Sequence, residues 1–455
     1  MNGYKLFLRG CEQLLKMNIQ IRLDKMVYGG EAIGRYEGKV VFVNGGMEGE
    51  LVDIQVTEQK KDYLRGDIIR IIQASPQRVT PLCKYSGVCG GCQWQYIDYQ
   101  EQLRLKERII YEQLVRIGGF DQPRVMPVIG MEFPWQYRNK ARFIIKTTNK
   151  GFAIGFCQTG TRDVVDIDYC HLISKQANKG YAALRKVIKE RFKPFHAHCG
   201  IEIKALNKGI MVFFITSSKF HQCLQKIMEE IQDIPVIKGV HHLIVDKDES
   251  SARTTYSSGI STITYSFEDI TVQAQATSFF QINPIQAQKL FKEAISLLNP
   301  QETHRILDGH CGVGALTLLI AQKAKEVIGV DIASSSINDA KINALLNRIE
   351  NVHFLQNSLN QAIARVDNLE QSSINRCLFD SVILNPPRDG IVEKQVIEWL
   401  LQTKPASIVY ISCNPATLAR DLKLLCSGGY SLDIVQPIDM FPQTYHVESI
   451  ASMQR

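Results

Sequence analysis

Three cysteines stand close together in the stretch CKYSGVCGGCQWQ, at Cys83, Cys89 and Cys92. Cys170, in DIDYCHLI, is a candidate fourth ligand further along the chain. Four thiolates suit either a 4Fe-4S cluster or a structural zinc ion. Zinc sites usually pair their ligands in two C-x2-C knuckles, and this set contains one such pair. The spacing therefore favours the cluster but leaves zinc open.

A glycine turn lies between two apolar runs in ILDGHCGVGALTLLIAQKAKEVIGVDIA. The segment reads as a strand, a turn, a helix and a second strand that ends at Asp331. Gly312 and Gly314 let the backbone pass close to a ligand, and Asp331, 23 positions after Asp308, can accept hydrogen bonds from a ribose. The third glycine of a dinucleotide site is absent. The pattern therefore predicts a nucleoside cofactor, with a turn that binds no ligand as the alternative.

Two further segments carry residue types that support covalent chemistry. Cys413 follows the apolar run SIVYI and precedes a helix-like segment, a position that exposes a thiol to ligand and can favour its thiolate. The ordinary alternative for a cysteine is a small buried residue. Glu448 and His446, in DMFPQTYHVESI, can act as general bases if the fold returns them to the edge of the sheet.

The elements that must position these residues fall into three parts, because 455 residues are too many for one ordinary domain. Residues 17–76 have short apolar runs between glycine turns, which predicts an OB-like β-barrel. Residues 77–275 mix strand-like and helical runs, which predicts a central α+β domain; the helix at 99–117 packs either there or on the C-terminal domain. Residues 276–455 alternate helices with apolar strands, which predicts a parallel, doubly wound α/β sheet.

Composition restricts the setting of the protein. No apolar run approaches the ~18 to 20 residues of a membrane span, and the N-terminus lacks the apolar block of a secretory signal. We therefore expect a cytoplasmic protein with no membrane partner. In that reducing compartment the 12 cysteines are more readily thiols, metal ligands or catalytic groups than disulfides. The net charge of +7 permits nucleic-acid binding without establishing it.

Two stretches combine basic and aromatic side chains. Lys60 and Lys61 stand beside Tyr63 in TEQKKDYLRG, and Arg138 lies in WQYRNKARF. Such mixtures suit single-stranded nucleic acid, because phosphates attract cations and bases stack on rings. The alternatives are a solvated hairpin tip and a strand with ordinary surface charges.

Five motifs, in order along the chain, resemble the signatures of the RNA uracil-5-methyltransferase family, whose class I fold uses S-adenosylmethionine (SAM). They are SFFQIN at 278–283, CGVG at 311–314, NPPRDG at 385–390, SCNPATLARDL at 412–422 and DMFPQTYHVESI at 439–450. The barrel resembles the TRAM domain attached to many members. The resemblance thus covers nearly the whole chain from about residue 18.

The resemblance implies methyl transfer from SAM to C5 of a uridine in RNA. Cys413 would be the nucleophile that adds to C6, and Glu448 the base that removes the C5 proton so that the thiolate can leave. Arg138 resembles a position that contacts the target uridine, and Lys60 and Lys61 would bind RNA phosphates. The residues expected to bind the cofactor are Gln281, His310, Gly312, Gly314, Asp331 and Asn385.

Members with the cysteine segment carry a 4Fe-4S cluster, so the resemblance favours that group for Cys83, Cys89, Cys92 and Cys170. We expect it to staple the central domain and help shape the RNA-binding surface, because methyl transfer moves no electron. A TRAM domain combined with this segment looks most like members acting on 23S rRNA, with tRNA as the alternative. We expect an RNA partner, no DNA, and a monomer.

Two positions depart from the family pattern. Asn385 stands where an aspartate is usual, and His310 where an aromatic residue is usual. The Asn385 amide offers a carbonyl acceptor but no charge to attract the ammonium of the cofactor. A catalytically impaired RNA-binding or assembly factor is therefore an alternative, although Cys413 and Glu448 are both present.

Overall fold

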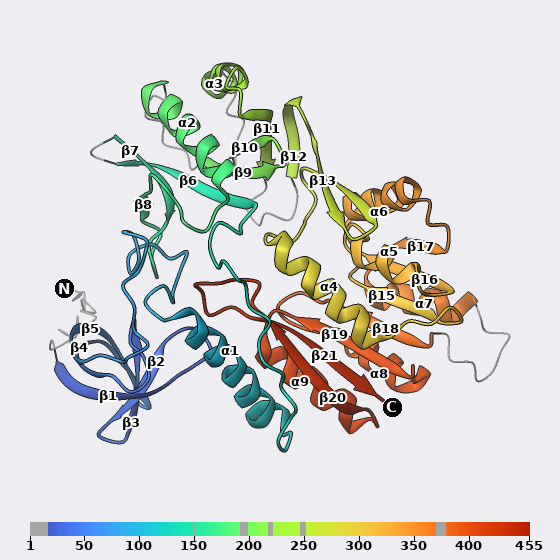
Figure 1. Cartoon of the computed structure of the whole chain (residues 1–455), viewed down its shortest axis with the longest axis horizontal. Coiled ribbons are helices and arrows are strands. Elements are labelled where there is room, and N and C mark those ends of the chain that lie inside the picture. Colours follow the sequence, from blue (N-terminus) through green and yellow to red (C-terminus); the bar gives the residue numbers. More distant parts are fainter. Residues whose placement is uncertain (1–16, 149–150, 192–198, 217–221, 246–251, 370–378) are drawn as a thin grey trace, which may run out of the picture.

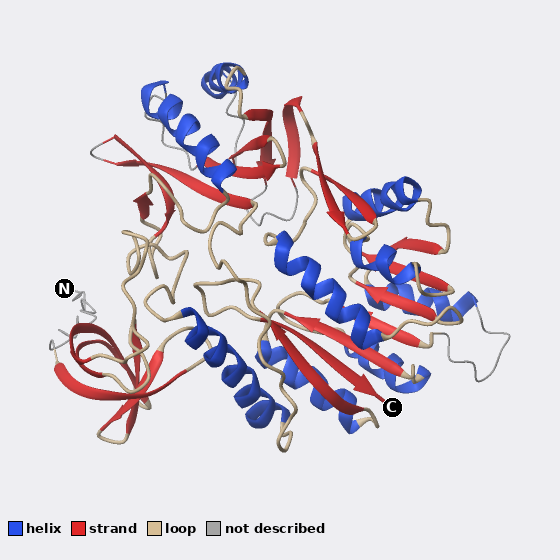
Figure 2. Ribbon diagram, in the orientation of Figure 1, coloured by secondary structure: helices blue, strands red, loops and turns tan. Residues whose placement is uncertain are grey.

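The computed structural model describes residues 17–148, 151–191, 199–216, 222–245, 252–369 and 379–455. An N-terminal barrel, a central sheet and a C-terminal sheet are connected by long irregular segments and one helix (Figures 1 and 2). Among these described residues, no helix is long and apolar enough to cross a membrane.

The N-terminal barrel is closed, with strand order β1-β2-β3-β5-β4. Buried and exposed positions alternate along β1, so that Ile19, Ile21 and Leu23 point into the barrel. The predicted barrel is therefore confirmed. Its strands are β1 (Asn18–Met26), β2 (Ala32–Tyr36), β3 (Lys39–Asn44), β4 (Leu51–Gln59) and β5 (Tyr63–Gln73).

Helix α1 (Tyr99–Gln113) lies between the barrel and the C-terminal sheet (Figure 1). Asp98 caps its start by accepting hydrogen bonds from two backbone N–H groups, and the helix continues into one π-helical turn, η1 (Leu114–Gly118). Leu105 belongs to the core of the barrel, whereas Ile110 belongs to the core on one face of the C-terminal sheet. The helix thus joins these two parts.

The central sheet has seven strands in the order β12-β11-β10-β9-β6-β7-β8. Every residue of β10 is buried. Helices α2 (Lys175–Arg191) and α3 (Gln222–Gln232) cover one face of the strand, and residues that include Ile263 and Ala276 cover the other. The strands are β6 (Lys140–Thr148), β7 (Gly151–Cys157), β8 (Val164–Asp166), β9 (Cys199–Leu206), β10 (Gly209–Thr216), β11 (Ile237–Val245) and β12 (Ala252–Gly259).

A separate hairpin, β13 (Thr262–Phe267) and β14 (Ile270–Gln275), lies against helix α6 (Ser334–Asn347) of the C-terminal domain. The side-chain amide of Asn343 donates to the carbonyl of Gln273 at 2.8 Å, and the same side chain accepts from the Gln273 N–H at 2.7 Å. The hairpin therefore forms a hydrogen-bonded contact with the sheet that carries the glycine turn.

The C-terminal sheet has the order β17-β16-β15-β18-β19-β21-β20. Its first five strands are parallel, and β21 is antiparallel to both of its neighbours. The prediction of a doubly wound α/β sheet is confirmed. The elements not yet given are α4 (Pro284–Leu298), β15 (Arg305–Gly309), α5 (Ala315–Ala321), β16 (Glu326–Asp331), β17 (Val352–Gln356), α7 (Leu359–Leu369), β18 (Ser381–Leu384), α8 (Lys394–Thr403), β19 (Ser407–Ser412), α9 (Pro415–Ser427), β20 (Ser431–Ile438) and β21 (Glu448–Gln454).

Alternate residues of the central strands belong to two cores, one on each face of this sheet. In β19, Val409 and Ile411 pack with residues of α4 and α5, whereas Ile408 and Tyr410 pack with residues of α8 and α9. Burial on both faces explains why these strands read as unbroken apolar runs. Their polar ends then collect at the carboxyl edge.

Candidate active site

Cys413 and Glu448 meet where strands β19 and β21 lie side by side. The strands are antiparallel, and Ser412, the last residue of β19, lies opposite Ser449. Cys413, one residue past the end of β19, therefore lies beside Glu448, the first residue of β21. The charge of the Glu448 carboxylate acts on the thiol. The structure thus brings the two predicted catalytic residues together.

Arg388 adjoins both of these residues, and sequence analysis did not assign it a role. Burial raises the pKa of the Cys413 thiol and Glu448 raises it further, whereas the positively charged Arg388 guanidinium lowers it. The Asn414 amide holds the Arg388 carbonyl at 3.1 Å and accepts from the Ala416 N–H to cap α9. The only sequence signal was the place of Arg388 in a loop that follows a strand end.

Glu448 has the ionisation behaviour of a base that works near neutral pH. Its side chain is buried, and burial raises its pKa to about 7, with the Arg388 guanidinium opposing the shift. A carboxylate with such a pKa can both accept and release a proton at neutral pH. His446, the other candidate base, differs: burial and the positive charges of Arg388, Lys106 and Arg138 lower its pKa to about 4.

The barrel reaches this site through the turn between β1 and β2. The ring of Tyr28 stands edge-on to that of Tyr445, with centroids 5.9 Å apart. Gly30 adopts φ +90° so close to the same ring that an added Cβ would lie 2.8 Å from a Tyr445 carbon. Burial raises the pKa of Tyr28 to about 12, and Tyr445 and Cys413 act in the same direction. Tyr28 is thus a neighbour of the Cys413 thiol that the sequence did not indicate.

Two neighbouring cavities lie at the carboxyl ends of β15, β16 and β18. One, of about 250 Å³, is lined by His310, Asp331, Ile332 and other residues, and the other, of about 70 Å³, by Gln281, His310, Gly312, Asn385 and others. His310 belongs to both. Five of the residues expected to bind the cofactor therefore line this paired cavity; the sixth, Gly314, caps the start of α5 behind it at φ +82°.

The residues around these cavities fit a nucleoside cofactor. Asp331 accepts hydrogen bonds from the Gly312 N–H at 3.0 Å and the Ala333 N–H at 2.8 Å, which leaves lone pairs for a ribose. A Cβ added at Gly312 would meet nothing within 4 Å, so a ligand can approach the backbone there. The buried His310 Nδ1 has no hydrogen-bond partner among the described residues. Buried polar atoms without partners are rare unless a ligand or water completes them.

The predicted metal ligands Cys83, Cys89, Cys92 and Cys170 all line one cavity of about 470 Å³, together with Cys157. The described part of the chain contains no group of three His, Cys, Asp or Glu side chains arranged to hold a single metal ion. The predicted ligands thus share one cavity, but in the described residues they are not arranged as a single-ion site.

Burial favours the protonated form of two of the predicted ligands, Cys89 and Cys92. Burial raises the pKa of Cys92 to about 12 and that of Cys89 in the same direction, and neighbouring cysteines add to both shifts. Positive metal centres reverse such shifts. Asp168 lies between β8 and Cys170 and accepts hydrogen bonds from the Lys84 amine and the Tyr85 hydroxyl, each at 2.7 Å. These bonds connect the cysteine segment to the chain around Cys170.

The candidate RNA-binding residues lie in different places. Lys60 and Lys61 are exposed on the β4–β5 turn, where Lys60 pairs with Glu58 at 3.2 Å. Arg138 lines the cysteine cavity, and its buried Nε has no hydrogen-bond partner among the described residues. Its charge also acts on His446, so Arg138 lies between the cysteine cavity and the residues around Cys413.

The chain matches the model of the tRNA (Uracil-5-)-methyltransferase family over residues 98–455 and that of the TRAM domain over residues 19–69. An uncharacterized RNA methyltransferase of Bacillus cereus (strain ATCC 10987 / NRS 248) is 32% identical over 450 residues, 96% of each chain. Another, from Clostridium acetobutylicum, is 34% identical over 454 residues, again 96% of each chain. The crystal structure of Pyrococcus abyssi tRNA (uracil-54, C5)-methyltransferase in complex with S-adenosyl-L-homocysteine is 24% identical in sequence to this chain. The match has a TM-score of 0.72 and covers 96% of this chain and 100% of that one.

The parallel sheet, its glycine turn and the cavities beside it define a class I SAM-dependent methyltransferase. The chain belongs to the tRNA (uracil-5-)-methyltransferase family and carries an N-terminal TRAM domain. It is therefore an enzyme, a SAM-dependent RNA methyltransferase of the uracil-5 class, and the resemblance drawn from the five motifs is confirmed.

Proposed function

We propose that the chain methylates C5 of one specific uridine through a covalent adduct between Cys413 and C6 of the base. The observation that carries this proposal is the pairing of Cys413 with Glu448 across β19 and β21, with Arg388 beside both. Addition to a pyrimidine requires a nucleophile, and elimination requires a base. Here a thiol, a carboxyl group and a cation are neighbours.

Each step of the reaction then has a residue. The Cys413 thiolate forms a bond to C6, and the electron pair of the C5–C6 double bond moves to the O4 carbonyl as an enolate. C5 then attacks the methyl group of SAM. The bond between this methyl group and the SAM sulfur breaks, and S-adenosylhomocysteine leaves. Glu448 takes the proton from C5, the double bond forms again, and the C6–S bond breaks to return the thiolate.

SAM binds in the paired cavity in this proposal, with its ribose on Asp331 and its methionine part between Gln281 and Asn385. Asn385 offers an amide to the ammonium of the cofactor, in place of a charge. Gly312 lets the cofactor lie against the backbone, and Gly314 starts helix α5 behind it. The uridine leaves its stack to reach Cys413.

The cysteine cavity holds a 4Fe-4S cluster in this proposal, ligated by Cys83, Cys89, Cys92 and Cys170. When bound, the cluster supplies cross-linking between the segment before α1 and the strand region of the central domain. No step of methyl transfer passes through it, because the reaction moves no electron. The arrangement of all four thiols around one cavity supports this assignment.

The substrate we propose is 23S rRNA, because a TRAM barrel together with the cysteine segment resembles members of that kind. Arg138 would contact the target uridine, and Lys60 and Lys61 would bind phosphates on the barrel. A tRNA substrate is the competing outcome, since the matching family is named for tRNA.

The test uses anaerobically purified protein, SAM, and unmodified 23S rRNA or tRNA in parallel, with 5-methyluridine mapped by mass spectrometry. We expect one methylated site in 23S rRNA, and none with Cys413→Ala. A single site in tRNA would replace the substrate and keep the chemistry. No product on either RNA, with SAM bound, would contradict catalysis by this site as it stands, and Asn385→Asp would then show whether the missing charge is the cause.

A further inference from the structure

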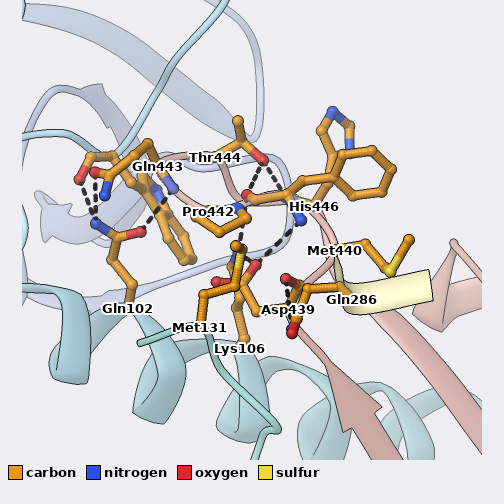
Figure 3. Close-up of polar contacts among 12 residues, drawn as sticks. Gln102, Lys106, Met131, Gln286, Asp439, Met440, Pro442, Gln443, Thr444 and His446 are labelled. Carbon is orange, nitrogen blue, oxygen red and sulfur yellow. Dashed lines mark hydrogen bonds and ion pairs between the residues drawn. The ribbon is translucent and has the colours of Figure 1, made fainter. Parts of the chain in front are cut away.

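The loop of residues 439–447, here named the base loop, joins β20 to β21 and ends directly before Glu448. It has no regular secondary structure over most of its length, so β-sheet hydrogen bonds do not fix its path. Figure 3 shows that side chains from outside the C-terminal sheet converge on it. The position of Glu448 therefore depends on these side chains as well as on strand pairing.

Lys106 of α1 and Asp439 form a fully buried ion pair at the start of the base loop. Both side chains have zero relative exposure, 0%, and the Lys106 Nζ lies 2.6 Å from Asp439 Oδ1 and 3.2 Å from the Phe441 carbonyl. The Tyr99 hydroxyl donates to Asp439 Oδ2 at 2.9 Å. Both carboxylate oxygens are thus occupied, and one ammonium holds two points of the loop.

A second pair, Gln102 and Gln443, holds the middle of the loop. The Gln443 N–H donates to Gln102 Oε1, and Gln102 Nε2 lies within hydrogen-bond distance of Gln443 Oε1, both at 3.0 Å (Figure 3). The Gln443 carbonyl accepts from the backbone N–H groups of Gln93 and Trp94, at 3.2 and 3.0 Å. These two residues follow Cys92 directly, so the cysteine segment is also bonded to the base loop.

Gln443 adopts a backbone conformation that it would not keep without such contacts. Its φ is +70°, in the left-handed region that residues other than glycine rarely adopt. Three further side chains fix the loop from other directions: Asn283 donates to the Met440 carbonyl, Gln286 to the Asp439 carbonyl, and Tyr137 to the Pro442 carbonyl, at 3.0 to 3.1 Å.

A buried ion pair is weak evidence for stability, because apolar residues of similar volume usually stabilise a core as well. What the pair does provide is a defined geometry, because the Lys106 ammonium is satisfied only where its hydrogen-bond acceptors, Asp439 Oδ1 and the Phe441 carbonyl, are in place. We propose that Lys106 is a positioning residue: with the Gln102–Gln443 pair it holds the base loop so that Glu448 faces the C5 proton of the uracil. This inference rests on the proposed function of Cys413 and Glu448.

A change in the position of Glu448 should affect one step of the reaction. Glu448 acts after methyl transfer, so a displaced carboxylate slows only the elimination that frees the enzyme. SAM binding and addition of Cys413 to C6 do not need Glu448. Loosening the base loop should therefore cause the methylated RNA–protein adduct to accumulate, whereas general unfolding would reduce adduct and product together.

The experiment incubates the full-length chain with methyl-labelled SAM and substrate RNA, and separates the covalent adduct on denaturing gels. For Lys106→Met we expect turnover to fall about 10- to 100-fold, as for a displaced catalytic group, with labelled adduct accumulating and SAM affinity unchanged. Lys25→Met is the matched control, because Lys25 also pairs with α1, through Glu112 at 2.7 Å, but does not contact the base loop.

Lys106→Met leaves Asp439 buried without its partner, so Lys106→Met/Asp439→Asn is made beside it to remove the unpaired charge. Adduct accumulation in either folded variant supports the proposal. Wild-type turnover, or loss of activity without adduct, overturns it, provided that Glu448→Gln accumulates adduct in the same assay. If Glu448→Gln itself accumulates none, the proposed function is wrong instead.

Discussion

At the scale of single residues, burial and one positively charged neighbour act in opposite directions on the ionisation of Cys413 and Glu448. Arg388 lowers the pKa of both groups, against the burial that raises both. The thiol must lose its proton before addition, and the carboxyl must lose its own before it can take the C5 proton. Both steps therefore gain from the same guanidinium.

Elimination should become faster as the pH rises through about 7. The folded-state pKa of Glu448 is raised to about 7, so its carboxyl is protonated and inactive as a base below that value and ionised above it. Decay of preformed methylated adduct, followed in single-turnover reactions from about pH 6 to about pH 8, measures this. The midpoint should stay in place in His446→Gln, because the pKa of His446 is about 4 and its ring is neutral throughout. A midpoint that moves with His446 would assign the base to the imidazole.

Arg388→Ala should raise the pKa of the Cys413 thiol further. A rise of about one unit lowers the thiolate fraction, and with it the rate of adduct formation, by about tenfold. The measurement is the pH dependence of Cys413 alkylation by iodoacetamide in the absence of RNA. Arg116→Ala, on the exposed turn η1, serves as the control with an unchanged profile. An unchanged profile in Arg388→Ala would show that the guanidinium does not act on the thiol.

At the scale of elements, the barrel is attached to the catalytic domain by a turn as well as by the chain. The Trp94 indole donates to the Gly30 carbonyl at 3.2 Å, and Gly30 packs against Tyr445 of the base loop. Helix α1 adds a second attachment, because it contributes to the cores of both parts. A TRAM barrel fixed in this way keeps Tyr28 near Tyr445 and Cys413.

Gly30→Ala should weaken this attachment. Its Cβ would lie 2.8 Å from the Tyr445 ring, and φ is +90°. Gly29→Ala is a matched control, because Gly29 has φ +109° but nothing within 4 Å of an added Cβ. We expect both to lose about 1 kcal/mol of stability from backbone strain, and only Gly30→Ala to lose methylation at saturating SAM. Equal activity in the two variants would mean that the turn can shift without effect on the site.

At the scale of the whole molecule, the cysteine segment and the catalytic sheet are bonded through Gln443. Gln93 and Trp94, next to Cys92, donate to its carbonyl, and Cys170 lies across the cavity in the central domain. A group that cross-links these cysteines would thus support the base loop from a distance. The proposed cluster would therefore affect methylation through structure, without any electron transfer.

Cys92→Ser should lose iron, lower the melting temperature and reduce methylation, while leaving SAM affinity unchanged. Iron content and the visible absorption of the anaerobically purified protein provide the direct readout. Cys157→Ser is the matched control, because Cys157 lines the same cavity but is outside the predicted ligand set. Iron that is lost with Cys157 and kept with Cys92 would require a different set of ligands.

Local patterns determined much of this protein from sequence alone. The apolar runs that end in Asp331, Asn385 and Cys413 predicted parallel strands buried on two faces, and the glycines at 312 and 314 predicted the cofactor turn. The strand inference succeeds because strand burial acts within a few residues of the chain, and both glycines have the positive φ that the predicted turn requires. The C-x5-C-x2-C spacing likewise marked a set of thiols that now line one cavity.

Only the tertiary structure decided which of these residues meet. Strand β21 inserts antiparallel between β19 and β20, and this pairing brings the start of β21, at Glu448, to the end of β19, next to Cys413. Arg388, Tyr28 and Lys106 gain their roles through contacts between segments distant in sequence, for which periodicity and spacing contain no signal. The physical reason is that a hydrogen bond or a pKa shift depends on distance in space, and strand order, which sets that distance, is a property of the folded chain as a whole.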